Sequence, residues 1–297
     1  MNLEYLQSFY MTVKCNSISK AAKTLHVTQP GLSMQLQNLE KELGVSLLNR
    51  SNKGVELTEE GKVVFDYANT MLSIQGNIER DLKSLQEEQQ RLIIGSCRSV
   101  GEYALPCSIY TFKKFNKKVD INMDVSNSSE VIEKLRDHSI NIGIIQYKPS
   151  EETQIITKTI ISDELVLVAN VNNTPEEISL EELKELPLIL REQNSGTRYL
   201  IENELKKHEL KIEDLNVIYS LNSPEAIKSS IISGKGFSFL PKLVIKQELK
   251  EGSLKIIKLK NFKVTFDYYI AFRKNYSFTE YEKMFVDFII SRKRGFC

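Results

Sequence analysis

The side chains best suited to contact another molecule lie near the amino end of the chain, between residues 17 and 43. Four leucines recur there at a spacing of four, three and four residues, which predicts a helix with one buried stripe. The opposite side of that helix carries amides, hydroxyls, a proline and a methionine in place of lysine and glutamate: Gln29, Pro30, Ser33, Met34, Gln35 and Gln37. These groups suit hydrogen bonds and contacts to base edges and phosphates in a DNA major groove.

A helix-turn-helix would position this polar face. The alanine-rich segment 18–25 predicts a short first helix, on which Ser19 is a further candidate contact. Thr28 is a good N-cap for the second helix, and Pro30 falls in its first turn. The alternative is an ordinary αα-hairpin, but turn chemistry and a polar face in the same segment favour DNA binding.

Two basic residues follow, in a segment that predicts two short extended pieces joined by a turn. Arg50 and Lys53 lie in this wing, where they could meet the DNA backbone beside the groove. The whole chain of 297 residues has a formal net charge of only +1. Because non-specific affinity scales with the phosphates neutralised, one copy should bind DNA weakly, and two copies held together would bind better.

A long helix is predicted over residues 59–90, which contain no proline. Its apolar residues alternate by four and three over three heptads, a period that favours packing against a partner helix. The expected dimerisation residues are Val64, Ala68, Met71, Ile78, Leu82 and Leu85. The alternative is a long helix that lies on the remainder of its own chain.

From residue 91 the pattern changes to short β-branched or aromatic runs that alternate with helical segments. This alternation predicts an α/β region with mostly parallel sheets. Because about 200 residues is generous for one sheet, we expect two lobes with a cleft between them. The expected division is a DNA-binding domain at 1–58 and a linker helix at 59–90. It continues with lobe I at about 91–161 and 267–297, and with lobe II at about 162–266.

Three polar segments between strands and helices could bind a ligand, because helix N-termini beyond strand ends attract anions. The candidates are Ser96, Arg98, Ser99, Asn127, Ser128, Asn194, Ser195 and Thr197, with Gln146 where the chain would cross the cleft mouth. Each segment taken alone is more often just a helix cap, and a solvated Arg98 is the plainer expectation. Three such helix N-termini in one cleft favour a polar or anionic ligand: a carboxylate, an amino acid or an inorganic oxyanion.

With these parts in order, the chain resembles the LysR-type transcriptional regulators along essentially its whole length. The resemblance is strongest in SISKAAKTLHVTQPGLSMQLQNLEKELGVSLLNR and GVELTEEG, and IGSCRSVGEYALP, LILREQNSGTR and NSPEAIKSSIISGKGFSFLP extend it. It implies an N-terminal winged helix-turn-helix, a long dimerising linker helix and a two-lobed, periplasmic-binding-protein-like α/β effector domain. It also implies dimers or tetramers on promoter DNA, whose geometry a small molecule in the cleft alters. Family positions put Ser96, Ser99, Asn127, Ser128 and Thr197 near that effector.

Two residues, Met34 and Leu48, depart from the family pattern. Met34 replaces a common arginine, which removes a direct guanine contact and leaves apolar or shape-based readout. Leu48 replaces a common phenylalanine of similar role.

Cys97 could be a redox sensor if its pKa were lowered, but the family's peroxide sensors use a cysteine pair in the second lobe. This chain has no cysteine between 108 and 296, so we expect Cys97 to line the pocket.

Catalysis, membrane insertion and cofactor chemistry find little support. His26, His138 and His208 are isolated, the four cysteines are scattered with no metal-ligand pair or disulfide framework, and no phosphate-binding glycine loop is present. No apolar run approaches the roughly 20 residues of a membrane span. We therefore expect a cytoplasmic regulator without metal or cofactor. The alternatives are a DNA-binding head fused to an enzyme, which would turn over its ligand, and an architectural DNA-binding protein without an effector.

Overall fold

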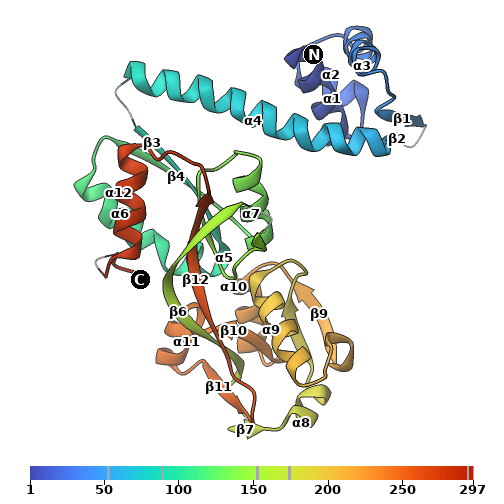
Figure 1. The fold of residues 1–297 in the computed structure, drawn as a ribbon. Helices are drawn as coiled ribbons and strands as arrows, with labels where there is room; N and C mark the ends of the chain where they lie inside the picture. Colours follow the sequence, from blue (N-terminus) through green and yellow to red (C-terminus); the bar gives the residue numbers. More distant parts are fainter. Residues whose placement is uncertain (52–53, 88–89, 152–153, 173–174, 293, 297) are drawn as a thin grey trace. The chain divides into compact units, whose positions relative to one another are not determined.

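The computed structural model describes residues 1–51, 54–87, 90–151, 154–172, 175–292 and 294–296 (Figure 1). The chain divides into two compact units. The first comprises Met1–Gln86 with Asp137–Ser139, and the second comprises Glu87–Arg136 with Ile140–Cys297. No helix within the described ranges is long and apolar enough to cross a membrane.

The first unit begins with three short helices and a two-stranded hairpin. These are α1 (Leu3–Cys15), α2 (Ile18–Thr24), α3 (Gln29–Leu43), β1 (Leu48–Ser51) and β2 (Gly54–Leu57). Side chains of Asn2, Ser17 and Thr28 accept hydrogen bonds from first-turn amides, so each helix begins at a residue with a free acceptor oxygen. β1 and β2 pair antiparallel with Leu48 opposite Leu57. The helix-turn-helix and the wing thus form where the local signals predict them.

The long helix α4 (Glu59–Glu87) follows the wing directly. Thr58 accepts a hydrogen bond from the Gly61 amide at 2.9 Å, which fixes its start. The first part of α4 completes the core of the winged helix: the Phe65 ring stacks on Tyr10 with centroids 5.1 Å apart, and Ala68 is fully buried. The buried core that α1, α3, the wing and α4 share consists of Leu6, Phe9, Leu36, Leu39, Leu47, Leu48 and Ala68.

The second unit alternates strands and helices. In chain order its strands are β3 (Gln90–Cys97), β4 (Val119–Ser126), β5 (Ile142–Ile145), β6 (Ile155–Asn170), β7 (Glu177–Ile178), β8 (Leu188–Arg191), β9 (Val217–Leu221), β10 (Ser238–Pro241), β11 (Leu254–Leu259) and β12 (Val264–Arg273). Its helices are α5 (Arg98–Tyr103), α6 (Leu105–Phe115), α7 (Ser128–Arg136), α8 (Leu180–Glu185), α9 (Gly196–Lys207), η2 (Ile212–Asp214), α10 (Pro224–Ile232), η3 (Lys242–Ile245), α11 (Lys246–Glu251) and α12 (Glu280–Ile290).

Two long strands, β6 and β12, pass from one lobe to the other (Figure 1). They pair antiparallel from Ile155 opposite Arg273 to Leu165 opposite Val264, with a register shift between Tyr268 and Tyr269. The main sheet runs in the order β4-β3-β5-β12-β6-β11-β7, and β10 also pairs with β6. The expected lobe boundaries therefore fall inside continuous strands.

The expectation of mostly parallel sheets is wrong for this unit. β3 pairs parallel with β4 and β5, and β8 pairs parallel with β9. The strands that meet β6, namely β10, β11 and β12, all run antiparallel to it. A strand that returns from the far lobe must run opposite to the strand that left, so crossing the cleft twice makes the sheet mixed.

Candidate nucleic-acid interface and ligand cleft

The second helix of the helix-turn-helix, α3, separates a buried stripe from an exposed polar face. Leu32, Leu36 and Leu39 are buried, and Leu43 packs partly buried against the same core. On the opposite side Gln29, Pro30 and Gln37 are exposed, and 59% of Met34 is accessible. The polar face predicted from the sequence is thus available to another molecule.

Some of the predicted DNA contacts also hold the domain together. The Ser8 hydroxyl of α1 donates to Oε1 of Gln35 at 2.7 Å, and the Ser19 hydroxyl of α2 donates to Oε1 of Gln29 at 3.0 Å. The Thr28 hydroxyl accepts from the Gly31 amide and so orients the first turn. Gln35 thus ties α3 to α1.

The wing is held by two residues that the sequence reasoning missed. Asn16, which ends α1 at a φ of 47°, accepts a hydrogen bond from the Val55 amide of β2 at 2.9 Å. Glu40 of α3 accepts from the amides of Leu47 and Leu48 at 2.8 and 3.3 Å. A left-handed asparagine after a helix is a recognisable signal, but its partner lies 39 residues away in the chain. Arg50 belongs to β1, and its side chain, like Lys53, lies outside the described part.

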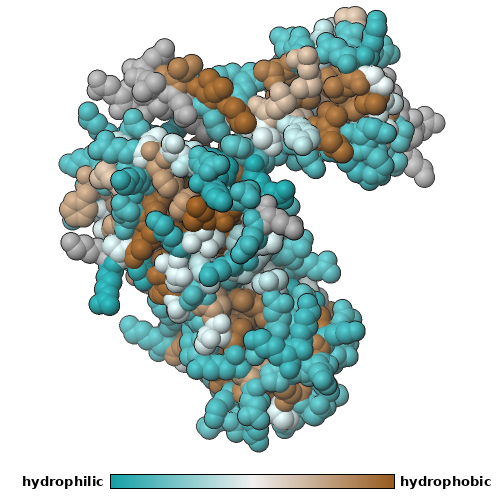
Figure 2. All heavy atoms as spheres, viewed as in Figure 1, coloured by the Kyte–Doolittle hydropathy of each residue, from teal (hydrophilic) through white to brown (hydrophobic). Residues whose placement is uncertain are grey.

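The apolar surface of α4 differs from the predicted stripe in its first turns. Ala68 is 0% exposed and Val64 is partly buried, because both face the core of their own winged helix. The large apolar side chains that remain exposed along α4 are Val63, Tyr67, Met71, Ile74, Ile78 and Leu82. Figure 2 shows hydrophobic residues exposed along this helix. The placement of Ala68 in a dimer seam is therefore wrong, whereas that of Val64, which is only partly buried, stays a prediction. Met71, Ile78 and Leu82 remain available, and the Leu85 side chain lies outside the described part.

In the second unit, several predicted ligand-binding residues come together between the lobes. Ser128, at the start of α7 in lobe I, accepts a hydrogen bond from the Gln146 amide at 3.1 Å. The Gln146 side chain exchanges a hydrogen bond of 3.3 Å with the hydroxyl of Thr197, at the start of α9 in lobe II. The rings of Tyr147 and Tyr199 contact each other in a tilted arrangement, with centroids 4.5 Å apart. Gln146 therefore joins the N-termini of two helices across the cleft.

Other residues that were predicted to bind the ligand cap helices or lie in turns. Asn127 accepts from the Glu130 amide at 2.8 Å, and Ser195 accepts from the Arg198 amide at 3.0 Å. Asn194 is exposed and adopts a φ of 66° in the turn before α9. The cap interpretation thus accounts for Asn127 and Ser195.

The end of β3 and the start of α5 bring Ser96 and Ser99 into the interior, where both are buried. Ser96 donates to the carbonyl oxygen of Cys97 at 3.1 Å. The Arg98 guanidinium lies 3.5 Å from a Glu102 carboxylate oxygen, and its Nε is buried without a hydrogen-bond partner among the described residues. Arg98 is therefore neither fully solvated nor fully paired.

Two buried polar residues were not anticipated from the sequence. Arg191, the last residue of β8, is 3% exposed and pairs with both carboxylate oxygens of Glu192 at 2.8 and 3.0 Å. Tyr268, at the β12 register shift, is fully buried, and its hydroxyl lacks a hydrogen-bond partner among the described residues. An arginine that ends an apolar strand was a visible signal, whereas the position of Tyr268 depends on strand pairing alone.

The environment of Cys97 opposes a redox role. Burial raises the pKa of its thiol to about 11, and the nearby Arg191 charge lowers it by less. The thiolate is the reactive form, so this cysteine is inert at neutral pH. Cys15 and Cys97 are free thiols, whereas Cys107 is disulfide-bonded, which the scattered positions of the cysteines did not predict. The described ranges contain no group of three or more His, Cys, Asp or Glu residues that could hold a metal ion.

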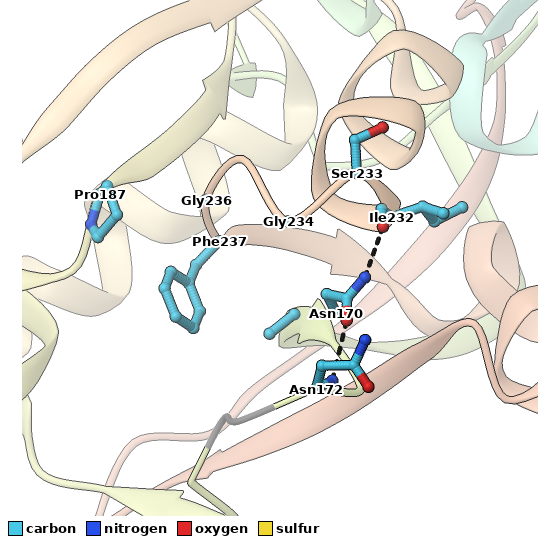
Figure 3. Close-up of a pocket in the computed structure, with 9 residues that line it drawn as sticks. Asn170, Asn172, Pro187, Ile232, Ser233, Gly234, Gly236 and Phe237 are labelled. Atoms are coloured by element: carbon cyan, nitrogen blue, oxygen red, sulfur yellow. Dashed lines mark hydrogen bonds between the residues drawn. The ribbon is translucent and has the colours of Figure 1, made fainter.

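A separate hollow lies in lobe II, where β6 ends near the C-terminus of α10 (Figure 3). It has a volume of about 430 Å³ and is lined by Ala169, Asn170, Asn172, Pro187, Ile232, Ser233, Gly234, Gly236 and Phe237. Asn170 donates to the Ile232 carbonyl oxygen within it. None of these lining residues carries a charge, and none was a predicted ligand contact.

Known protein families match the sequence of both units. The family described as "Bacterial regulatory helix-turn-helix protein, lysR family" matches residues 3–62, and "LysR substrate binding domain" matches residues 85–294. A "Probable RuBisCO transcriptional regulator" of Thalassiosira pseudonana is 29% identical over 89% of this chain and 88% of its own length.

Two solved structures share the fold. Full-length CbnR complexed with its target DNA has a TM-score of 0.70 at 20% identity and covers 97% of this chain and 99% of its own. The CcmR regulatory domain of Synechocystis PCC6803 in complex with 2-PG has a TM-score of 0.62 at 22% identity, over 68% and 96%.

The fold and the matched segments define a winged helix-turn-helix protein with a two-lobed effector-binding domain. The chain belongs to the LysR family of transcriptional regulators. Its relatives are regulators of transcription, and the chain is not an enzyme.

Proposed function

We propose that this protein binds promoter DNA sequence-specifically through the exposed polar face of α3, with the wing against the adjacent backbone. The observation that carries the proposal is a helix whose leucines are buried while Gln29, Pro30, Met34 and Gln37 face outward. Amides can pair with adenine, and Met34 offers apolar contact to a thymine methyl group. The complex of CbnR with its target DNA supports the same use of the related domain.

We further propose that the protein acts as a dimer or tetramer that assembles through α4. The exposed residues Met71, Ile78 and Leu82 would lose their contact with water against a partner helix. Two copies would also present two recognition helices to a pseudo-palindromic site and double the number of phosphate contacts. Such a protein would act in the compartment that holds the DNA, the bacterial cytoplasm.

The proposed effector is a small polar or anionic molecule bound between the lobes. The N-termini of α7 and α9 come together at Gln146, and both favour negative charge. The Arg191 guanidinium lies buried close to Cys97 and Tyr268. CcmR, a protein of the same fold, has been solved in complex with 2-PG. A carboxylate, an amino acid or an inorganic oxyanion would fit these groups.

The DNA-binding proposal is tested with Gln37→Ala and a matched control, Gln7→Ala, which removes an exposed amide from α1. The operator DNA for this test is identified by footprinting beside the protein's own gene. Gln37→Ala should weaken operator binding by about 10-fold, as for one lost base contact, and leave random-DNA binding nearly unchanged. Equal losses on both DNAs, or an equal effect of Gln7→Ala, would reject base readout by α3.

The effector proposal is tested by thermal unfolding with sulfate, phosphate, 2-PG, shikimate and the amino acids. A ligand that binds only the folded protein at 100 times its Kd should stabilise it by about 2.7 kcal/mol. Thr197→Val should abolish this shift, whereas Thr159→Val, at an exposed position of β6, should retain it. A shift that survives Thr197→Val would place the site elsewhere. No shift with any small molecule would favour an architectural protein.

A further inference from the structure

A cluster of four polar side chains joins the two lobes of the second unit at the end of α5. Its lobe I member is Tyr103, whose hydroxyl donates to Oε2 of Glu225 on α10 at 2.9 Å. The Lys228 ammonium, also on α10, lies 4.7 Å from the centroid of the Tyr103 ring. Lys228 pairs with Glu225 at 2.9 Å and with Glu248 of α11 at 2.6 Å.

The positive charge of Lys228 is paired within lobe II. Lys228 is only 4% exposed, and a buried ammonium must be paired to remain charged. Glu225 and Glu248 already provide that pairing, and both belong to the same lobe as Lys228. Tyr103 therefore adds a hydrogen bond and a cation–π contact that exist only while the lobes keep their present arrangement.

Tyr103 remains a hydrogen-bond donor at any pH that the protein meets. Burial, the hydrogen bond to Glu225 and the nearby carboxylates raise the pKa of its phenol well above the ordinary value. Its ring packs against buried apolar residues of both clusters that form the core of the second unit. The side chain thus has few alternatives to its present position.

The helix that carries Tyr103 begins at Arg98 and Ser99, two of the residues predicted to bind the effector. α5 spans only Arg98–Tyr103, about 9 Å at 1.5 Å per residue, and Ser99 in its first turn is buried close to Tyr268. The other end of this rigid turn is the residue that bonds to α10. A shift of α5 at the cleft must therefore move Tyr103 relative to Glu225.

We propose that Tyr103 is a latch between the lobes: its contacts with Glu225 and Lys228 hold the present lobe arrangement, and a ligand that displaces α5 must break them. The link to the ligand depends on the proposed effector site. The latch itself does not, and it can be tested without any ligand.

The test is amide hydrogen exchange of the full-length, ligand-free protein. Tyr103→Phe removes the donated hydrogen bond and keeps the ring; Tyr110→Phe, at an exposed tyrosine of α6, is the matched control. Amides of α5 and η3, which contact each other, should exchange about three to ten times faster in Tyr103→Phe, as for one lost hydrogen bond. Helix α12 should exchange at its usual rate, and Tyr110→Phe should change none of these segments.

Glu225→Ala and the double variant Tyr103→Phe/Glu225→Ala test whether Tyr103 acts through its hydrogen bond to Glu225. If both residues act through one bond, Tyr103→Phe/Glu225→Ala should exchange no faster at α5 than the faster single variant. Unchanged exchange at α5 in Tyr103→Phe would overturn the proposal. Faster exchange in α12 as well as α5 would also overturn it, because the bond would then support general stability. Because no effector is used, either result is independent of the test of the effector site.

Discussion

Removal of one exposed leucine from α4 should measurably weaken self-association. Leu82 is 57% exposed, so a partner helix could bury roughly half of its surface. Full burial of a leucine side chain contributes about 1.5–3 kcal/mol, and about half of that is near 1 kcal/mol for each copy. A symmetric dimer contains two copies, so Leu82→Ala should cost about 2 kcal/mol.

The expected effect is a dimer dissociation constant about 30 times higher for Leu82→Ala. Leu82→Asp should weaken the dimer further, because a carboxylate would lose water in the interface. Sedimentation equilibrium measures both, with Tyr110→Ala on α6 as the control, since this residue is also exposed and apolar but lies off α4. An unchanged association constant for Leu82→Asp would refute the assignment of the exposed face of α4 to self-association.

Three other substitutions or conditions have predictable outcomes. A Cβ at Gly61 would lie 2.1 Å from the Leu47 carbonyl oxygen, so Gly61→Ala should destabilise the first unit by about 2 kcal/mol or more in urea unfolding. Asn16→Ala removes the acceptor of the Val55 amide and should weaken DNA binding by a few-fold in gel-shift titrations, with a loss of about 1 kcal/mol in stability. The folded-state pKa of Cys97 is raised from 9.0 to about 11, so the thiol contributes stability that is complete below pH 9 and lost as pH rises through 11. Iodoacetamide at pH 8 should therefore leave Cys97 unmodified in the native protein; rapid alkylation there would show that the thiol is accessible and ionised.

The sequence predicted the helix-turn-helix, the long helix and the alternation of strands and helices because their signals are local. Caps such as Thr28, a stripe of leucines and short β-branched runs each act within a few residues. Some elements of the second unit have weaker local patterns. The two-residue β7 and the six-residue α8 are too short to show a period, and the lysine-containing β11 forms because β6 and β7 lie beside it.

The functional residues also divide into those that local patterns predict and those that depend on long-range packing. The polar face of α3 could be predicted, because a helix that buries its leucines must expose the residues half a turn away. The ligand cleft was predicted only as three loops, and which groups meet there was not. Arg191 and Tyr268 are buried where β8 ends and where β12 shifts register, and no short stretch of chain contains that information.

The amino-acid sequence by itself determined a winged helix-turn-helix with an outward polar face, a long helix and a two-lobed α/β region, since periodicity and capping depend on near neighbours along the chain. Only the tertiary structure decided which side of α4 remains exposed. A heptad pattern records that residues are apolar, but Ala68 meets the core of its own domain while Tyr67, one residue earlier, faces solvent. The same long-range packing bonds Asn16 to Val55 and Tyr103 to Glu225, because such contacts require that the chain has already folded.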